Sequence, residues 1–196
     1  GEYSDSQTIT VTVNAVNDDP VANAASGETI EDQSVVIVLT GNDVDGDNLT
    51  FSLENDAING SVTLDGSFST YTPNPNFYGD DSFTFSVFDG SVYSNASVSI
   101  SVAAVNDAPV LATVADVFFD EDGVGSLSLS ASDVDGDNLI YDITAGVDIS
   151  ASLLGSDVSF SAPADYNGSE SFVVSVDDGE YSDSQTITVT VNAVND

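Results

Sequence analysis

The stretch "SFTFSVFDGSVYSNASVSISVAAVNDAPV", residues 82–110, holds two runs in which apolar and polar residues alternate, followed by an acidic hexapeptide. Alternation with a period of two is the pattern of strands with one buried face, so it predicts strands at residues 82–88 and 97–105. Asp, Gly and Asn separate the two runs, as is typical of turns. Nearly the same hexapeptide, "VNDDPV", occurs at residues 16–21. The stretch therefore predicts short strands that end one unit just before a repeated linker.

The hexapeptide marks a regular repeat. Asp18, Asp107 and Asp196 close its three copies, and both spacings agree, since 107 − 18 = 89 and 196 − 107 = 89. Residues 1–18 recur letter for letter at residues 179–196. Self-similarity at a fixed period indicates a tandem array. The sequence thus predicts the last strand of a preceding, truncated repeat at 1–18, a first repeat at 19–107 and a second repeat at 108–196.

Each repeat contains about seven strand-like runs and no run of helical periodicity. A first strand is expected near Val21, and further runs occur at residues 34–40, 49–53, 60–64 and 68–72. The second copy follows at residues 125–131, 138–143, 149–154, 157–162, 171–176 and 184–194. Seven short strands in about 89 residues are typical of an immunoglobulin-like β-sandwich, here without its disulfide because the chain has no Cys. We expect the repeats to join end to end.

The composition restricts the function. Asp and Glu number 34, there is no Lys, Arg or His, and the formal charge is −34. Such a chain repels nucleic acids and anionic membrane surfaces, so neither is expected as a partner. Since 41% of the residues are apolar, with ten Phe and seven Tyr, disorder is not expected. Direct membrane insertion is not expected either, because no apolar run approaches the roughly 20 residues of a span.

Acidic residues recur in register in both repeats. The segments "NDVDGDNL" and "SDVDGDNL" are 90 positions apart, as are "IED" and "DED", and an aspartate follows a strand in each copy. Asp, Asn and Gly also form ordinary turns, which is the competing explanation. However, no side chain of the protein can neutralise these charges, and only oxygen ligands are available. Ca²⁺ accepts six to eight such ligands from several loops, whereas Mg²⁺ requires octahedral geometry and is the weaker candidate.

The aspartate segments do not match an EF-hand loop. That loop requires Gly at its sixth position and Glu at its twelfth. Here the sixth residue is Asn48 or Asn138, and the twelfth is Glu54 in one copy but Thr144 in the other. A strand-like run follows, so an EF-hand is excluded.

Nearly the whole chain resembles cadherins, and more closely the bacterial cadherin-like tandem repeats of large secreted surface adhesins. "VNDAPV" is similar to the cadherin linker, "SDVDGDNLIYDI" to its acidic loop and following strand, and "DEDG" to its N-terminal acidic segment. The resemblance implies tandem cadherin-like β-sandwich domains with Ca²⁺ between consecutive domains. Ligands then come from the end of one domain, the linker and two loops of the next.

Carried over by position, the resemblance implies three sets of ligands. The complete junction would combine Glu31 with Asn106, Asp107, Asp133, Asp135, Asp178 and the carbonyl group of Asn138. The upstream junction would use Asn17, Asp18, Asp43, Asp45, Asn48 and Asp89, and the downstream one Glu121, Asn195 and Asp196. The family's acidic motif in mid-domain has no clear counterpart; Asp81 and Glu170 are nearest.

Taken together, these features predict a calcium-rigidified extracellular spacer of a bacterial surface adhesin, which holds distal binding domains away from the cell. Its partners would be adjacent repeats of the same chain. The alternative is a calcium-dependent adhesive or carbohydrate-binding module that contacts a cell-surface protein or polysaccharide through the repeats; the absence of Trp counts against sugars. An enzyme is not expected, because small sandwiches with short loops offer little concave surface.

Overall fold

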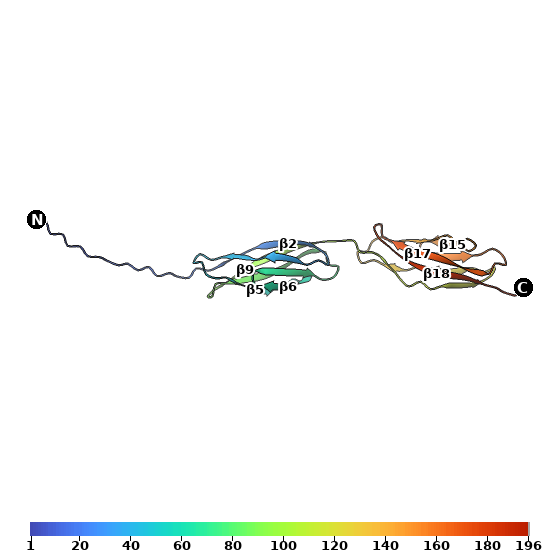
Figure 1. Ribbon diagram of the computed structural model, residues 1–196, viewed down its shortest axis with the longest axis horizontal. Coiled ribbons are helices and arrows are strands. Elements are labelled where there is room, and N and C mark those ends of the chain that lie inside the picture. The colour runs from blue at the N-terminus through green and yellow to red at the C-terminus, as the bar shows by residue number, and fades with distance from the viewer. Residues whose placement is uncertain (196) are drawn as a thin grey trace. The chain divides into compact units, whose positions relative to one another are not determined.

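The protein is described here by a computed structural model of residues 1–195, which contains strands and no helix in that range. Contacts divide the chain into two compact units, unit 1 at Gly1–Val105 and unit 2 from Asn106 onward. Figure 1 colours unit 1 from blue to green and unit 2 from yellow to red. The prediction of tandem all-β domains is confirmed. No helix in the described range could cross a membrane.

In the part of the chain that the structure describes, each unit has nine strand segments. Unit 1 has β1 (Val21–Asn23), β2 (Ala25–Ile30), β3 (Val35–Val38), β4 (Thr40–Asn42), β5 (Thr50–Asn55), β6 (Gly60–Asp65), β7 (Phe68–Pro73), β8 (Gly79–Phe88) and β9 (Tyr93–Ala103). Unit 2 has β10 (Val110–Leu111), β11 (Val117–Asp120), β12 (Gly125–Ser128), β13 (Ala131–Ser132), β14 (Ile140–Ile143), β15 (Ser150–Leu154), β16 (Asp157–Ser161), β17 (Gly168–Asp177) and β18 (Ser182–Asn192).

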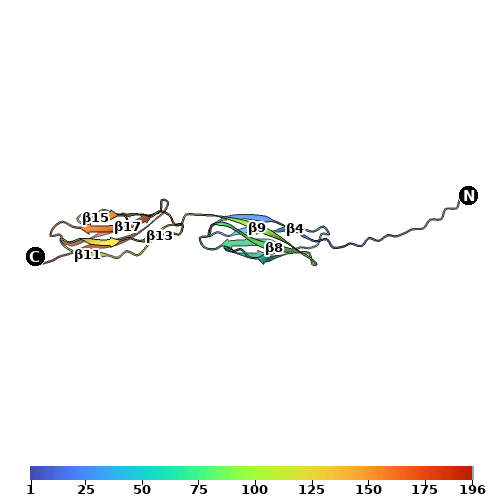
Figure 2. The same cartoon turned by 180° about the vertical axis from the view of Figure 1, so that it is seen from behind.

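The strands of each unit form two main sheets (Figure 2). In unit 1, β2-β9-β8-β5 form a four-stranded sheet and β3-β7-β6 a three-stranded one, with β1 paired to β4. Unit 2 repeats this as β11-β18-β17-β14, β12-β16-β15 and β10-β13. Neighbouring strands are antiparallel except for β2–β9 and β11–β18, which are parallel. The loops before β5 and β14 therefore lie at the same end of their unit as the β8–β9 and β17–β18 turns.

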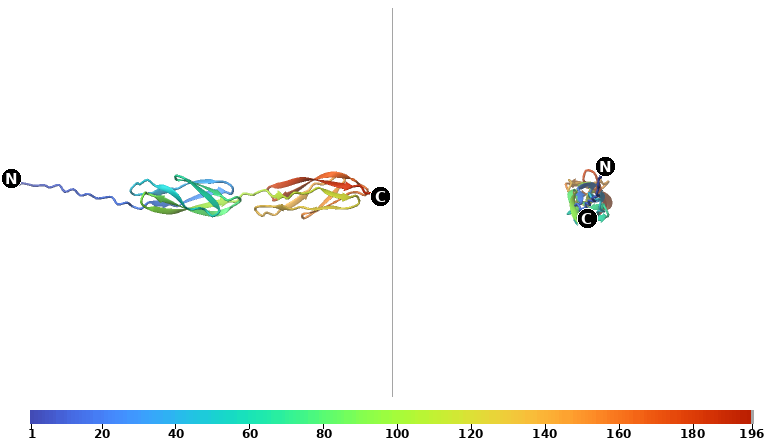
Figure 3. Two further views of the ribbon diagram at one scale, coloured as in Figure 1. Left: turned by 90° about the horizontal axis from the view of Figure 1, so that it is seen from below. Right: turned by 90° about the vertical axis from the view of Figure 1, so that its left-hand side faces the viewer.

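The buried residues of each unit come from both of its main sheets and form one core between them; Figure 3 shows the strands of each unit from below. Alternate residues of the opening stretch point into it: Phe83, Phe85 and Val98 are at most 1% exposed. Burial of such a side chain contributes about 1.5–3 kcal/mol before entropy is counted. The alternation that predicts β8 and β9 is therefore the pattern of core contacts.

The strand β2, with its counterpart β11, is absent from the sequence prediction. Its residues, "ASGETI", lack apolar alternation because Gly27 faces the core, where a Cβ atom would lie 2.8 Å from the Ile37 side chain. In unit 2 the sizes are exchanged. Val117 takes the place of Gly27, and Gly125 takes the place of Val35, where a Cβ would be 2.5 Å from Phe119 and 2.9 Å from Val117. The small residue thus lies on the first of the two edge strands in unit 1 and on the second in unit 2. The apolar alternation within β2 is interrupted for this reason, and the sequence pattern does not predict the strand.

Residues 1–20 form no strand and run as an extended segment (Figure 1). The side chains of Ile9, Val11 and Val13 are at least 80% exposed. The same sequence in unit 2 forms β18, where Ile187, Val189 and Val191 are buried. The segment thus retains an apolar face with no core to cover it.

Candidate cation-binding sites

Three segments meet at the end of each unit where the chain enters. They are the residues before the first strand, the aspartate loop before β5 or β14, and the turn between the last two strands. In unit 1 they carry Asn17, Asp18, Asp43, Asp45, Asp47 and Asp89, and in unit 2 Asn106, Asp107, Asp133, Asp135, Asp137 and Asp178. Each set lies within one unit.

The first aspartate of each loop folds the loop back on itself. Oδ1 of Asp43 accepts the backbone N–H groups of Asp45, at 2.9 Å, and Asp47, at 3.2 Å. This is the local bonding that Asp side chains provide in turns. Gly46, with φ of 80°, allows the chain to reverse in the left-handed region. The carboxylates of the three aspartates therefore converge, with one oxygen of each within 4.8 Å of the others.

The loop of unit 2 has the same geometry. Oδ1 of Asp133 accepts from Gly136 at 2.9 Å and Asp137 at 3.2 Å, and Gly136 has φ of 78°. Oxygens of Asp133, Asp135 and Asp137 again lie within 4.8 Å of one another. Burial, together with the negative charges of Asp133, Asp135 and Asp178, raises the pKa of Asp137 above its ordinary value. A bound cation would remove this repulsion.

The turn aspartates are held in the ionised form. Oδ1 of Asp89 accepts the N–H groups of Ser91 and Val92, and Oδ2 accepts Nδ2 of Asn17 at 3.0 Å. The hydrogen bond from Asn17, followed by the backbone bonds, lowers the pKa of Asp89. Asp178 repeats these contacts with Glu180, Tyr181 and Asn106, and the backbone bond from Tyr181 leads the lowering of its pKa.

The entering chain is tied to the aspartate loop as well. The backbone N–H of Asp18 donates to Oδ2 of Asp45 at 2.7 Å, and that of Asp107 donates to Oδ2 of Asp135 at 2.8 Å. Together with the bonds from Asn17 and Asn106, these contacts fix the "ND" dipeptide against two loops of its own unit.

Within residues 1–195, four buried carboxylate oxygens have no hydrogen-bond donor: Oδ2 of Asp43, Asp107 and Asp133, and Oε2 of Glu31. A buried polar atom without a partner costs about 1–3 kcal/mol, and more when it is charged. The sequence has no Lys, Arg or His that could pair with them. These atoms therefore fit a hard cation bound by oxygen, and the donor set suits Ca²⁺.

Glu31 lies at the other end of unit 1, where the chain leaves. It is 4% exposed, its N–H donates to the carbonyl of Ala103 at 2.9 Å, and its Oε1 accepts from Val105 at 2.5 Å. Glu121 repeats the arrangement in unit 2, accepting from Val194 at 2.6 Å. The glutamate thus holds the departing chain with one oxygen and leaves the other free for a cation.

Asp47 and Asp137 belong to the clusters, although the resemblance did not assign them as ligands. Their spacing of two from the preceding aspartate was the available signal. Asn48 and Asn138 follow directly and are exposed. Downstream, Asn195 is exposed, and Asp196 lies outside the described residues.

Asp81 and Glu170 lie elsewhere and bind their own backbone. Asp81 accepts the N–H groups of Ile58 and Asn59 and, at 2.9 Å, the hydroxyl of Tyr71. Glu170 accepts from Val147 and Asp148. Burial opposes ionisation of Glu170, but these backbone bonds prevail and lower its pKa. With their oxygens engaged, both carboxylates anchor loops, so they do not replace the missing acidic motif of mid-domain.

Two solved cadherin structures support the fold. The match to a two-domain fragment (EC1-2) of human protocadherin-24 covers 91% of this chain and 100% of that fragment, with a TM-score of 0.59 and 18% identity. A four-domain fragment of protocadherin gamma B7 matches 91% of this chain over 52% of its own, with a TM-score of 0.51 and 15% identity. An endo-fucoidan hydrolase of glycoside hydrolase family 107 matches 94% of this chain, which spans 30% of that enzyme, at 21% identity and a TM-score of 0.40.

No curated protein matches the sequence. The family model of the bacterial Ig domain, in contrast, matches twice, at residues 17–101 and 106–190. Both matches begin at or beside the asparagine that bonds to the turn aspartate. The chain therefore belongs to the bacterial Ig domain family, of which it contains two tandem domains.

Proposed function

We propose that the two units are spacer repeats of a secreted or surface-attached bacterial adhesin, made rigid by Ca²⁺, and that they hold distal binding domains away from the cell. Tandem domains of the bacterial Ig family and the cadherin-like fold support an extracellular setting. The charge of −34 supports a role in which the repeats remain soluble and separate from one another.

The observation that carries the proposal is the set of buried oxygens without donors. Oδ2 of Asp43 and Oδ2 of Asp133 occupy equivalent positions in the two units. In this proposal Asp43, Asp45, Asp47 and Asp89 hold Ca²⁺ in unit 1, and Asp133, Asp135, Asp137 and Asp178 in unit 2. The ion supplies the positive charge that the chain lacks.

Rigidity would follow from the attachment of the linker. The N–H of Val105 is bonded to Glu31 of unit 1, and the next residue, Asn106, is bonded to Asp178 of unit 2. No free residue separates these two attachments. Oδ2 of Asp107 is a further ligand candidate, and a cation there would hold the linker more firmly against the aspartate loop.

Calorimetric titration with Ca²⁺, with Mg²⁺ as the control, tests binding. Small-angle scattering then tests the spacer role: the maximum dimension should rise on addition of Ca²⁺, and Asp107→Ala should reduce the rise. Binding without any change in scattering would leave a calcium protein that is not a rigid spacer. Absence of binding would refute the whole proposal.

One observation favours an adhesive role as the second candidate. Phe88 and Tyr93 stack at a centroid distance of 4.3 Å beside Asp89, and Tyr93 is 63% exposed. An exposed aromatic ring next to a cation can bind a sugar. Pull-down of the chain on insoluble polysaccharides and on cells, with and without Ca²⁺, distinguishes this role from that of a spacer. Retention that disappears with Tyr93→Ser would favour adhesion.

A further inference from the structure

We infer that each unit bears tension along the chain through its one pair of parallel strands, β2–β9 in unit 1 and β11–β18 in unit 2, and that unit 2 yields before unit 1. The inference rests on strand topology, on register and on the side-chain contacts of unit 2, and no step of it requires a bound cation.

The direction of load follows from the strand order. β2 is near the start of unit 1 and β9 is its last strand, and the two pair in parallel from Ala25 with Val98 to Ile30 with Ala103. Tension on the N-terminal side pulls β2 toward Ala25, whereas tension on the C-terminal side pulls β9 toward Ala103. The strands must therefore slide past each other. Sliding loads all the hydrogen bonds between them together, whereas antiparallel terminal strands would separate one bond at a time.

The two units differ in the length of this ladder. β2 and β9 share six paired positions, but β11 and β18 share only four, from Val117 with Val189 to Asp120 with Asn192. Both ladders end in the same bond, from Glu31 to Ala103 at 2.9 Å in unit 1 and from Glu121 to Asn192 at 2.9 Å in unit 2. The difference therefore lies at the N-terminal end of β11.

Side chains replace the missing ladder in unit 2. Oε1 of Gln185 accepts the N–H of Val114 at 3.0 Å, and its Nε2 donates to the carbonyls of Leu111 and Ala112 at 3.0 and 3.1 Å. Oδ1 of Asp116 accepts the N–H of Thr188 at 2.7 Å. The amide of Gln185 thus acts as a substitute peptide group. In unit 1 the equivalent position is Ala96, which has no such group.

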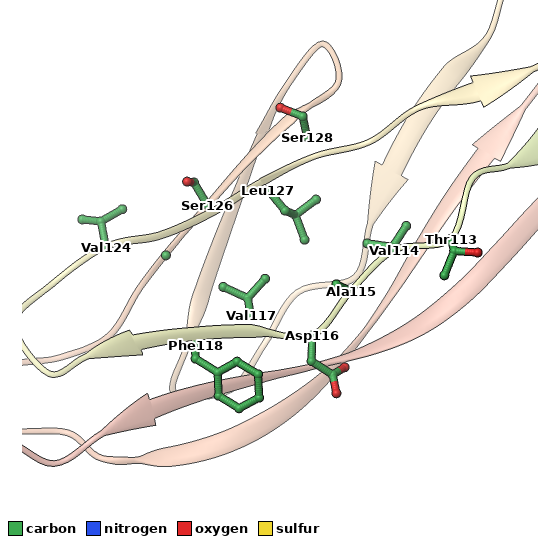
Figure 4. Close-up of a pocket in the computed structure, with 11 residues that line it drawn as sticks. Thr113, Val114, Ala115, Asp116, Val117, Phe118, Val124, Ser126, Leu127 and Ser128 are labelled. Atoms are coloured by element: carbon green, nitrogen blue, oxygen red, sulfur yellow. The ribbon is translucent and has the colours of Figure 1, made fainter.

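The same segment borders a groove of about 530 Å³ between β11 and β12 (Figure 4). Residues 113–118 form one wall and residues 124–128 the other. The bonds from Gln185 to Ala112 and from Thr188 to Asp116 are exposed, so water can replace them as they stretch. These side-chain hydrogen bonds also act as tethers whose side chains can lengthen by rotation about their single bonds before they carry load. The tethers therefore resist sliding less than two further paired positions of backbone would.

The expected difference can be estimated from the two additional positions in unit 1. Two backbone hydrogen bonds that break together in the transition state change an unfolding rate on the order of tenfold. The side-chain tethers of unit 2 offset part of this difference, so at a given force unit 1 should unfold more slowly than unit 2 by a factor of up to about ten. Forced unfolding reports this rate directly.

The test is single-molecule pulling of the whole chain through its ends, in the presence of a chelator. Ten Gly and Ser residues inserted into the exposed turn at Asp65–Gly66 lengthen the step of unit 1 by about 35 Å, so each step can be assigned. The first unfolding event should be the one without the added length, which is that of unit 2. A marked step that comes first, or at the same force, would overturn the order of yielding.

Three variants then test the mechanism, with the other unit of the same molecule as reference. Gln185→Ala should raise the unfolding rate of unit 2 severalfold and leave unit 1 unchanged. By the alternation of a parallel ladder, the N–H of Thr29 faces β9 as that of Glu31 does, whereas the N–H of Glu28 faces outward. Thr29→Pro should therefore lower the force for unit 1, and Glu28→Pro should not. Equal effects of the two prolines would overturn the inference.

If Thr29→Pro leaves no folded unit 1, the direction of pulling decides. The chain has no Cys, so Asp65→Cys provides a single attachment site at the β6–β7 turn. Pulling between that site and the C-terminus does not slide β2 along β9, so unit 1 should unfold at a clearly lower force than when it is pulled through its ends. Equal forces in the two directions would refute the clamp.

Discussion

Asp133→Asn separates the two roles of the aspartate that begins the loop of unit 2. Oδ1 of Asp133 closes the loop by accepting from Gly136 and Asp137, and the asparagine carbonyl can do the same. Oδ2 is buried without a donor, and in the variant an NH₂ group takes its place. The substitution therefore retains the loop while it removes one negative charge and puts a donor where a cation needs an acceptor.

The expected effect differs between the two conditions. In chelator, the variant should be as stable as the unaltered chain or slightly more so, because the repulsion between residue 133 and Asp137 is removed. With Ca²⁺, unaltered unit 2 should gain about 1.4 kcal/mol at a tenfold excess over a dissociation constant of about 10⁻⁴–10⁻³ M. That gain corresponds to a rise in Tm of roughly 6–11 °C for a domain of this size. The variant should lose most of it.

Hydrogen exchange measured by mass spectrometry on the whole chain reports each unit separately. Ca²⁺ should slow exchange on the order of tenfold in both units of the unaltered chain, but only in unit 1 of Asp133→Asn. Asp43→Asn is the matched control, and it should show the reverse pattern. The reasoning is refuted if Asp133→Asn destabilises unit 2 equally with and without Ca²⁺, because the residue would then be only part of the turn.

Three further predictions address pH, the loop anchors and the first residues. In chelator, Tm should rise as pH falls from 7, because Asp137 has a raised pKa in the folded state and its protonation therefore favours folding. Below about pH 3.8 Tm should decrease, because Asp89 and Asp178 have depressed pKa values in the folded state and lose their stabilising charge there. A Tm that decreases steadily as pH is lowered from 7 would contradict this. Asp81→Ala should lower the unfolding free energy of unit 1 by about 2 kcal/mol in urea, since Tyr71 and two backbone groups lose their acceptor, without changing the gain from Ca²⁺. A smaller gain would mean that Asp81 contributes to the cation site. Removal of residues 1–16 should leave the protein monomeric in dilute solution but reduce its association at high concentration, because the apolar face of Ile9, Val11 and Val13 is then absent. If light scattering shows the same association state with and without residues 1–16 at high concentration, this segment is inert.

Strands with one clearly buried face could be predicted from the sequence, because core contact imposes the alternation. β8 and β9 are examples. β2 could not be predicted, because its inward position is Gly27 and the matching bulk is Ile37 on another strand. Such an exchange of volume is a property of a pair of strands, and periodicity within one strand does not contain it.

The acidic loops could be located by their repetition, but the state of each oxygen could not. Within the loop of unit 2, one oxygen of Asp133 closes a turn while the other is buried without a partner. Nothing in the sequence "DVDGDN" distinguishes these two oxygens. Asp81 and Glu170 show the converse, because their carboxylates are saturated by backbone N–H groups from distant positions. Which carboxylates are free depends on contacts between loops, and the spacing of acidic residues does not report those contacts.

The exchange of sizes between Gly27 and Gly125 limits how copies of the repeat can recombine in a gene. A crossover between the two edge strands would join β11, with Val117 and Phe119, to β3, which has Val35 where β12 has Gly125, and overfill the core. The reciprocal product would join Gly27 to β12, with Gly125, and leave a void. Residues 1–18 and 179–196 are identical, so an exchange within the last strand alone would leave the core unchanged, whereas the first strands would have to be exchanged together as a block.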